Sequence, residues 1–486
     1  MDITALNPQI VWKYFHEITQ VPRPSKKEGK ILAYLLDFAK KHNLEYKQDE
    51  AGNLVIRKPA TPGYENRETV VLQSHVDMVC EKNAGTQHNF DTDPIRTIID
   101  GEWMHADGTT LGADNGIGCA AELAILASND IEHGPIECLF TVDEETGMTG
   151  AMNLKPGFFD GKILLNLDSE DEGELFIGCA GGMGVIAMFE PKYTAATTDY
   201  SFFHVKVFGL KGGHSGGDIH VGLGNANKVL TRYLYALESN LDWALAEIGG
   251  GNLHNAIPRE AHATFGIKAA DKAKAEQLLA ELRANVKDEL KRVDPNVDLI
   301  LEQVQAPQFI MDCETKGRLV RALYACPHGV LGMSHELENL VETSNNLASI
   351  KTVDGGKIRV ETSQRSSTES LRNSTAEMVR SVFELAGAKA DIRDPYPGWK
   401  PNADSAILKV AAETYRKLFG KEPAVKAIHA GLECGLILDV FPGLDMVSFG
   451  PTLRDVHSPA ERIEIKTVDL WWRHLLEVLK AIPVAK

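Results

Sequence analysis

Histidine and carboxylate side chains recur where apolar segments of the chain end, and side chains of this kind can bind metals. Residues 71–77 end in His75 and Asp77, which are two positions apart and therefore lie on one face of an extended strand. The carboxylate of Asp77 could then orient an imidazole that binds a metal. This pair is common on its own, so the rest of the sequence has to supply further ligands.

Three adjacent carboxylates, Asp143, Glu144 and Glu145, follow another apolar segment. Like charges this close repel one another unless a positive group lies nearby. A solvated acidic loop would show the same pattern, but a bound cation explains it better.

Three further side chains can complete a metal site. Asp114 lies in a loop bounded by Gly112 and Gly116, where it is either a ligand or the cap of the following helix. Asp168 follows another apolar segment, and His457 adds a second imidazole near the end of the sequence. A mixed set of nitrogen and oxygen ligands suits zinc, cobalt or manganese better than calcium or magnesium. With one carboxylate shared, the set divides into two open sites, as in a hydrolase with two metals.

The segments that carry these side chains alternate between helical and strand-like patterns, which is typical of an α/β domain. Helices are predicted after Pro8, after Ser25–Glu28, which fits a capping box, and at residues 116–127. Short apolar or β-branched runs predict strands at residues 53–58, 69–75, 136–142 and 163–167. Runs of this kind indicate a mostly parallel, twisted sheet with helices on both faces.

The pattern changes near residue 200. Strands and helices follow one another in the ferredoxin-like order βαββαβ over residues 202–303, which indicates a separate α+β domain. Further signals continue to residue 394, so we expect an added subdomain that continues the same sheet. The α/β alternation then resumes after residues 396–399.

These changes of pattern predict a catalytic domain made of residues 1–188 and 396–486, interrupted by a lid domain at residues 189–395. Periodicity does not prove that the two ends of the chain form one domain. The expectation rests on the candidate ligands, because His457 belongs to the second end and the others to the first.

Composition narrows the classes of function. The 486 residues include 51 Lys and Arg against 68 Asp and Glu, and the formal charge of −17 repels nucleic acids and anionic lipid surfaces. No apolar run approaches the roughly eighteen residues of a membrane span, and the first residues do not resemble a secretion signal. Seven cysteines without a Cys-x-x-Cys pair predict neither disulfides nor a thiolate zinc site. We therefore expect a cytoplasmic protein without nucleic-acid or membrane partners.

Several motifs together resemble a known family. In chain order they are LQSHVDMV, GTTLGADNGIG, DEETGMTGA, LNLDSEDEGE, GCAGG, GLKGGHSGGDIHVGLGNANK, NAIPREA, YPGW, HAGLECG and HSPAERI. They span about residues 50–465 and resemble the bacterial aminoacyl-histidine dipeptidases (Xaa-His dipeptidases, peptidase D), in the clan of dizinc exopeptidases with carnosinases and carboxypeptidase G. The resemblance implies a zinc-exopeptidase-like α/β catalytic domain with a mostly parallel twisted sheet, interrupted by an α+β lid containing the βαββαβ unit.

The resemblance also implies roles for the metal-site side chains. Asp77 would fix the imidazole of His75, and Glu144 would be the general base. The peptide bond Asp114–Asn115 would be cis, as it often is in this clan. Two divalent metal ions are implied, with zinc expected and cobalt or manganese able to substitute. Their ligands would be His75 and Asp168 for one ion, Glu145 and His457 for the other, and Asp114 as the bridge between them.

In the lid, the resemblance implies that His214 stabilises the tetrahedral oxyanion, whose charge is absent in the ground state. Asn255 and Arg365 match positions that contact substrate, and the arginine could pair with a free C-terminal carboxylate. A surface arginine at a strand end would explain Arg365 equally well. His429 and Glu433 could line the pocket for a substrate side chain or amine, or could be a helix start and its neighbour.

The function implied is the hydrolysis of Xaa-His dipeptides, carnosine-like ones included, through a metal-bridging hydroxide that Glu144 activates. Another metal-dependent amidohydrolase of the clan, such as a tripeptidase or an acylamino-acid deacylase, is an alternative. A non-catalytic binder of metal or peptide is a second alternative. The implied partners are small peptides, and the lid could also form a homodimer and offer His214 to the partner's site.

Overall fold

The computed structural model describes residues 3–485, which divide into two compact units. The first unit comprises the described residues up to Gly178, Pro401–Ala427 and the segment from Leu432 onward, and the second comprises Cys179–Lys400 and Ile428–Gly431. Within residues 3–485, no helix is both long enough and apolar enough to cross a membrane.

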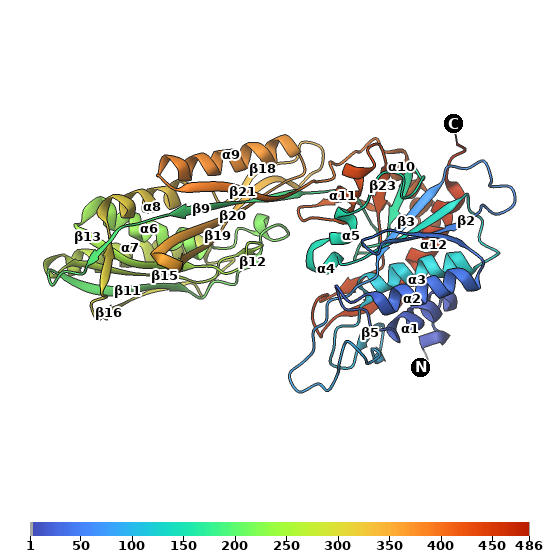
Figure 1. Cartoon of the computed structure of the whole chain (residues 1–486), viewed down its shortest axis with the longest axis horizontal. Helices are drawn as coiled ribbons and strands as arrows, with labels where there is room; N and C mark the ends of the chain where they lie inside the picture. Colours follow the sequence, from blue (N-terminus) through green and yellow to red (C-terminus); the bar gives the residue numbers. More distant parts are fainter. Residues whose placement is uncertain (1–2, 486) are drawn as a thin grey trace. The chain divides into compact units, whose positions relative to one another are not determined.

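The first unit is built around a sheet with the strand order β1-β2-β6-β3-β7-β23-β8-β22 (Figure 1). The central strands β6, β3, β7 and β23 run parallel, whereas β1, β2 and β8 pair antiparallel with their neighbours. The predicted parallel character is therefore found in the centre of the sheet, where the continuous apolar runs are buried. The strands are β1 (Glu45–Gln48), β2 (Leu54–Lys58), β3 (Val70–His75), β6 (Ile136–Thr141), β7 (Ile163–Asn166), β8 (Glu174–Cys179), β22 (Ala424–Ile428) and β23 (Asp445–Ser448).

Helices cover this sheet, and α1, α2 and α3 lie together on one side of it (Figure 1). The last helix, α12, is amphipathic and buries Trp471, Leu475 and Val478, so packing stabilises it. The helices are α1 (Gln9–Thr19), α2 (Gly29–Lys41), α3 (Ala113–Ala127), α4 (Glu144–Gly147), α5 (Thr149–Met152), α10 (Ala406–Phe419), α11 (Glu433–Val440) and α12 (Ile465–Ala481), and the short 3-10 turn η1 covers Ile3–Ala5.

The helix predicted from the capping box begins differently from the prediction. α2 starts at Gly29 and receives no side-chain cap. Instead, the hydroxyl of Ser25 donates to Asp77 Oδ2 at 2.7 Å, and Glu28 Oε1 accepts the backbone N–H of Asp143 at 3.0 Å. The capping-box prediction is therefore wrong, because both side chains bind the loops that follow β3 and β6.

A smaller sheet that the sequence did not predict joins segments from both ends of the chain, in the order β24-β25-β5-β4. Its pairing of β25 with β5 aligns Arg462 with His105 and Ile463 with Met104. The turn between β24 and β25 carries His457, so this pairing fixes a late segment of the chain to an early one. The strands are β4 (Thr97–Asp100), β5 (Trp103–Ala106), β24 (Leu453–Arg454) and β25 (Arg462–Glu464).

The second unit contains an antiparallel sheet in the order β16-β11-β15-β13-β19-β20-β9-β21, with β18 beside β19. The elements β11, α6, β13, β15, α7 and β16 follow one another in the predicted ferredoxin-like order. They are β11 (Tyr200–Phe208), α6 (Ala226–Asn240), β13 (Trp243–Gly250), β15 (Ala261–Lys268), α7 (Lys272–Leu290) and β16 (Asp298–Val304).

The sheet continues from β13 into β19, which pair at Gly250 and Ile350. The expected subdomain that extends the same sheet is therefore present. Its elements are β9 (Gly181–Phe189), α8 (Cys313–Ala325), β18 (Gly329–Met333), β19 (Val341–Val353), β20 (Lys357–Ser366), α9 (Glu369–Leu385) and β21 (Lys389–Tyr396). Short pairs and turns complete the unit: β10 (Tyr193–Ala195) with β17 (Phe309–Met311), β12 (Gly213–His214) with β14 (Ala256–Ile257), and the 3-10 turns η2 (Ile219–Val221), η3 (Ala269–Asp271) and η4 (Asp354–Gly356).

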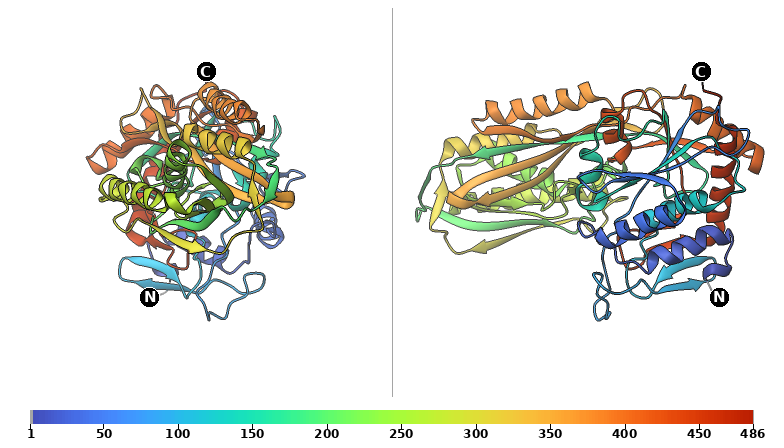
Figure 2. Two further views of the ribbon diagram at one scale, coloured as in Figure 1. Left: turned by 90° about the vertical axis from the view of Figure 1, so that its left-hand side faces the viewer. Right: turned by 45° about the vertical axis from the view of Figure 1, so that its right-hand side comes forward.

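Helices α6 to α9 lie side by side along one face of this sheet (Figures 1 and 2). Tyr233 of α6 packs against Phe265 of β15, and Phe383 of α9 packs against Phe189 of β9. One apolar layer thus spans the ferredoxin-like part and its extension, so the two halves share one core.

Candidate active site

The five side chains predicted as metal ligands all lie in the first unit, and Asp114 is at the centre of them. Asp114 Oδ1 lies 3.1 Å from Nε2 of His75, and Asp114 Oδ2 lies 3.1 Å from Nε2 of His457. The two oxygens of one carboxylate therefore face two different imidazoles. The peptide bond between Asp114 and Asn115 is cis, as predicted.

The two remaining carboxylates lie on opposite halves of this cluster. Asp168 Oδ1 lies 3.4 Å from Nε2 of His75, whereas Glu145 Oε2 lies 3.0 Å from Nε2 of His457. The cluster thus consists of two halves that share Asp114. Each half contains one imidazole and one carboxylate of its own, which is the composition that the resemblance implies for a pair of metals.

The cluster has features of a metal-binding site. Glu145 Oε1 is buried and makes no hydrogen bond, and Asp168 Oδ1 makes none beyond the 3.4 Å approach of His75. Buried oxygens without hydrogen bonds are costly. His75, Asp114 and Glu145 each offer a ligand atom within 4.8 Å of the others. The imidazole and carboxylate donors fit a divalent transition metal or zinc, which would pair these oxygens.

The pKa shifts of the two imidazoles also fit a site for positive ions. Burial opposes protonation of His75, but Asp168 and Asp114 outweigh it and raise the pKa of His75 well above its ordinary value. Hydrogen bonds to Asp114 and Glu145 raise the pKa of His457 to about 11. The carboxylates thus create a strong preference for positive charge at this point of the molecule.

Asp77 connects His75 with the segment that carries two other site residues. Asp77 Oδ1 lies 3.4 Å from Nδ1 of His75. The same carboxylate accepts the backbone N–H of Glu144 at 3.0 Å and that of Glu145 at 3.2 Å. Burial opposes ionisation, yet the hydrogen bonds from His75 and Ser25 lower the pKa of Asp77 to about 2. Asp77 therefore orients both the imidazole and the start of α4.

Glu144 is the first residue of α4 and follows Asp143, whose φ of 51° is in the left-handed region. Burial raises the pKa of Glu144 well above its ordinary value, and the nearby carboxylate of Asp168 adds to this effect. A carboxyl group with a raised pKa can hold a proton near neutral pH, as a general base must do before it returns that proton.

The second unit brings together His214, Asn255, Arg365 and His429. His214 lies on β12 opposite Ala256 of β14. The backbone N–H of the next residue, Ser215, donates to the carbonyl of Asn255 at 2.8 Å, and its hydroxyl oxygen lies 3.4 Å from Nε of Arg365. Ser215 therefore links the predicted oxyanion residue to two of the predicted substrate residues.

The hydrogen bonds of His214 fix its tautomer. Nδ1 of His214 accepts the backbone N–H of Gly217 at 2.9 Å and that of Gly216 at 3.3 Å. A nitrogen that accepts carries no proton, so the neutral ring has its N–H at Nε2. Burial and the charge of Arg365 lower the pKa of His214. The ring is thus a neutral donor through Nε2, which suits an oxyanion.

Arg365 is buried, so it is not a surface arginine. Its Nη1 donates to the hydroxyl of Tyr396 at 2.7 Å. His429 Nε2 lies 2.7 Å from the hydroxyl of Ser344, and burial together with Arg365 lowers the pKa of His429 to about 3. A Cβ at Gly216 would lie 2.2 Å from the His429 carbonyl oxygen, so this close approach requires glycine.

Glu433 belongs to the first unit, whereas His429 belongs to the second. Glu433 begins α11 in the first unit, where it is buried and its Oε2 accepts from the side chains of Gln73 and Thr141, each at 2.7 Å. Burial raises the pKa of Glu433 to about 7. The two residues considered together in the sequence therefore belong to different units.

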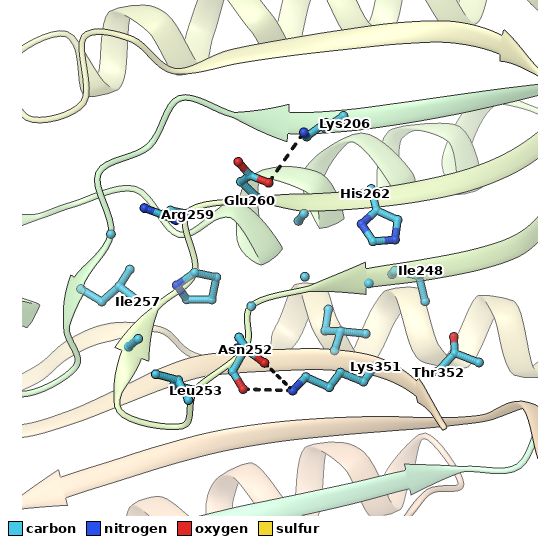
Figure 3. Close-up of a pocket in the computed structure, with 18 of the residues that line it drawn as sticks. Lys206, Ile248, Asn252, Leu253, Ile257, Arg259, Glu260, His262, Lys351 and Thr352 are labelled. Carbon is cyan, nitrogen blue, oxygen red and sulfur yellow. Dashed lines mark hydrogen bonds and ion pairs between the residues drawn. The ribbon is translucent and has the colours of Figure 1, made fainter. Parts of the chain in front are cut away.

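A cavity of about 760 Å³ opens in the second unit (Figure 3). None of the predicted site residues lines this cavity. Lys206 lies 3.7 Å from Glu260 on its wall, and Nζ of Lys351 donates to the carbonyl of Asn252 at 3.0 Å. These two lysines thus already have partners in the wall.

Three ionisable residues near the predicted ligands were not predicted from the sequence. Burial and Asp114 raise the pKa of Glu170 to about 8. Arg23 and Glu461 are buried and bind the backbone of the loop that carries Asp114. Glu461 lies in the HSPAERI motif, so the sequence could have indicated it as a site residue. Arg23 stands between two prolines, and no sequence pattern marks it as one.

Comparisons with known proteins agree with this geometry. Residues 71–481 match the model of peptidase family M20/M25/M40. Over 483 residues the chain is 43% identical to the cytosol non-specific dipeptidase of Escherichia coli (strain K12), with 99% of each chain covered. The crystal structure of aminoacylhistidine dipeptidase from Vibrio alginolyticus matches with a TM-score of 0.93 and 45% identity, covering 100% of this chain and 99% of that chain.

A tripeptidase from Staphylococcus aureus shares the fold at 19% identity, with a TM-score of 0.57 and coverage of 98% of this chain and 99% of that chain. The family model covers most of the sequence, and the Escherichia coli relative matches over nearly all of it. This chain therefore belongs to peptidase family M20/M25/M40.

Proposed function

We propose that this metallopeptidase is a cytoplasmic dipeptidase that hydrolyses Xaa-His dipeptides with two bound divalent metal ions. Zinc is the metal that we expect. One observation carries the proposal: the carboxylate oxygens of Asp114 each face a different imidazole. The relatives named cytosol non-specific dipeptidase and aminoacylhistidine dipeptidase support dipeptide substrates, and the first name supports the cytoplasm.

In this proposal the first unit holds the metals and the proton acceptor. When bound, the two ions supply an acidified water and polarise the scissile carbonyl. Asp77 orients His75 through Nδ1 so that Nε2 faces the centre of the cluster. The carboxylate of Glu144 accepts a proton from the attacking water and returns it to the departing amine. The ligands would be His75 with Asp168, Glu145 with His457, and Asp114 between the two ions.

The second unit would bind the substrate and the developing charge. His214 would donate its Nε2 proton to the oxyanion, because its Nδ1 is already occupied. Arg365 would pair with the free C-terminal carboxylate of the dipeptide. The amide of Asn255 and the ring of His429 would contact the substrate, and Glu433 would help to line the pocket for a substrate side chain or amine.

We propose that the first unit is the catalytic domain and the second unit the lid; the sequence analysis divides them at residues 188/189 and 395/396, and the compact units divide near Gly178 and Pro401. The lid could join two chains as a homodimer. Sedimentation equilibrium of the purified protein tests this, and a single species of monomer mass up to tens of micromolar would contradict it.

A substrate panel combined with metal analysis tests the function. We expect cleavage of Ala-His and β-Ala-His, little cleavage of tripeptides or N-acetyl-histidine, about two metals per chain, and loss of activity with chelator that zinc restores. Preference for N-acylated substrates would replace the dipeptidase proposal with a deacylase. Turnover that survives complete removal of metal would overturn the proposal.

A broader dipeptidase is the second candidate, favoured by the non-specific dipeptidase of Escherichia coli. The same panel separates the two. Equal kcat/KM for Ala-Ala and Ala-His would support broad specificity, whereas a large preference for Ala-His would support the narrower proposal.

A further inference from the structure

The turn between β24 and β25 carries a second functional candidate, Glu461, four positions after His457. Glu461 is only 2% exposed, and its carboxylate accepts four backbone N–H groups from one loop. That loop leads directly to Asp114. The donors are Leu111 at 2.7 Å and Gly112 at 2.9 Å to Oε2, and Ala113 at 2.8 Å and Asp114 at 3.3 Å to Oε1.

Arg23 binds backbone carbonyl groups of the same loop and of the segment that follows β3. Its Nη1 donates to the carbonyls of Val76 at 3.0 Å and Asp77 at 2.8 Å, and its Nη2 donates to the carbonyl of Gly112. Gly112 thus donates to the buried carboxylate of Glu461 and accepts from the buried guanidinium of Arg23. Hydrogen bonds to ionised groups are stronger than neutral ones, so this loop is held firmly.

Three segments that carry predicted ligands are joined in this way. Glu461 connects the turn of His457 with the loop of Asp114, and Arg23 connects that loop with the end of the strand that carries His75. Asp114 has to present one oxygen to each imidazole, so a shift of its loop would change both halves of the cluster together.

We propose that Glu461 is a positioning residue for the metal pair, which fixes the bridging carboxylate of Asp114 relative to His457. This inference deepens the proposed function and rests on it for the identity of the bound ions. Side chains that orient metal ligands in this way typically change metal affinity about 10-fold to 100-fold when they are replaced.

The substitution Glu461→Gln tests the proposal with little change of size. Glutamine keeps one acceptor oxygen, but its NH₂ group would face backbone N–H donors, so part of the bonding to the loop is lost. Glu137→Gln is the matched control, because Glu137 is also buried in the first unit. Its Oε2 accepts the backbone N–H groups of Asp160 and Gly161, each at 2.8 Å.

Three measurements on the full chain separate a positioning role from a structural one. They are titration of metal-free protein with Zn²⁺ against a chromophoric chelator, the visible spectrum after loading with Co²⁺, and thermal unfolding. We expect Glu461→Gln to bind at least one ion about 10-fold to 100-fold more weakly and to change the cobalt spectrum. Glu137→Gln should leave affinity and spectrum unchanged, whatever its effect on the melting temperature.

Wild-type affinity and an unchanged cobalt spectrum in Glu461→Gln would overturn the positioning role, even if the variant melts earlier. A wild-type chain that binds no pair of ions would instead refute the proposed function, and this inference with it. Arg23→Lys provides a second variant if Glu461→Gln does not fold. Lysine keeps the charge but not the guanidinium geometry, so we expect the same spectral change, and its absence would count against the proposal.

Discussion

In the first unit His75 and His457 lie among carboxylates, whereas in the second unit His214 and His429 lie close to Arg365. The carboxylates raise the pKa of the first two imidazoles. Burial and the guanidinium lower the pKa of the other two. The same side chain is therefore placed in opposite electrostatic surroundings in the two units.

This difference bears on the chemistry that each unit can perform. The first cluster attracts cations, and bound metal ions can activate water for peptide hydrolysis. The second cluster keeps its imidazoles neutral beside an arginine and suits the negative charges of an oxyanion and a substrate carboxylate. Substitutions in each cluster can test this contrast.

Replacing Glu144, the proposed proton acceptor of the first cluster, should have the largest effect on activity. Glu144→Gln should lower kcat by about 10³-fold to 10⁴-fold, since an amide cannot accept the proton of the water. Metal content should stay unchanged, because Glu144 is not among the expected ligands. Steady-state kinetics and elemental analysis check both statements, and loss of metal would show that Glu144 is a ligand.

Removing the donor of the second cluster should have a somewhat smaller effect. His214→Ala should lower kcat by about 10²-fold to 10³-fold, with KM and metal content close to those of the wild type. His204→Ala, on β11 of the same unit, serves as the control and should leave both kinetic constants unchanged. A change in KM alone would mean that His214 binds substrate and does not stabilise the oxyanion.

Crowding the loop of Asp114 should reduce stability. Gly112 has a φ of 71°, and a Cβ there would lie 2.5 Å from Nη2 of Arg23. Gly157 has a similar φ of 79° with no atom within 4 Å of a Cβ, so its replacement measures the backbone strain alone. Gly112→Ala should therefore cost about 1 to 3 kcal/mol more than Gly157→Ala in denaturant unfolding. Equal losses of unfolding free energy in the two variants would show that the loop of Asp114 can move to make room for the methyl group.

The smallest expected effect concerns the neutral imidazole of His429. In the folded chain the pKa of His429 is about 3, which is below that of an exposed histidine. Below about pH 6.5 the unfolded chain therefore binds a proton at this ring that the folded chain does not bind. This contribution to stability is present above pH 6.5 and is lost progressively as the pH falls toward 3.

The substitution His429→Gln removes this titration and keeps a polar partner for Ser344. Between pH 7 and pH 5.5 the wild type should lose about 1 kcal/mol more of its free energy of unfolding than the variant. Parallel pH profiles for the two proteins would contradict the assignment of a neutral ring.

Much of the fold could be predicted because apolar runs are long where strands and helices are buried. The ferredoxin-like order and its extension follow from such runs, and the structure contains both. The small sheet could not be predicted, because β24 and β25 are two and three residues long and show no periodicity. The capping box misled for a related reason: Ser25 and Glu28 bind loops that are distant in sequence.

The candidate ligands were visible in the sequence because each lies at the end of an apolar segment or inside a distinctive motif. The residues that hold these candidate ligands in place were not visible in the sequence. A sequence does not show which backbone groups a side chain will contact. Glu461 binds N–H groups up to 350 positions away, and Arg23 binds a carbonyl 89 positions away. Only the folded chain brings these partners together.

The pairing of β25 with β5 also bears on the order in which the two halves of the cluster can be assembled during synthesis. The side chains of His75, Asp114 and Asp168 have all left the ribosome long before the β24–β25 turn is translated. His457 and Glu461 arrive together on that turn, and with them come the second imidazole and the clamp on the bridging loop. A nascent chain can thus gather one half of the cluster early, whereas the other half becomes complete only after the β24–β25 turn has been translated.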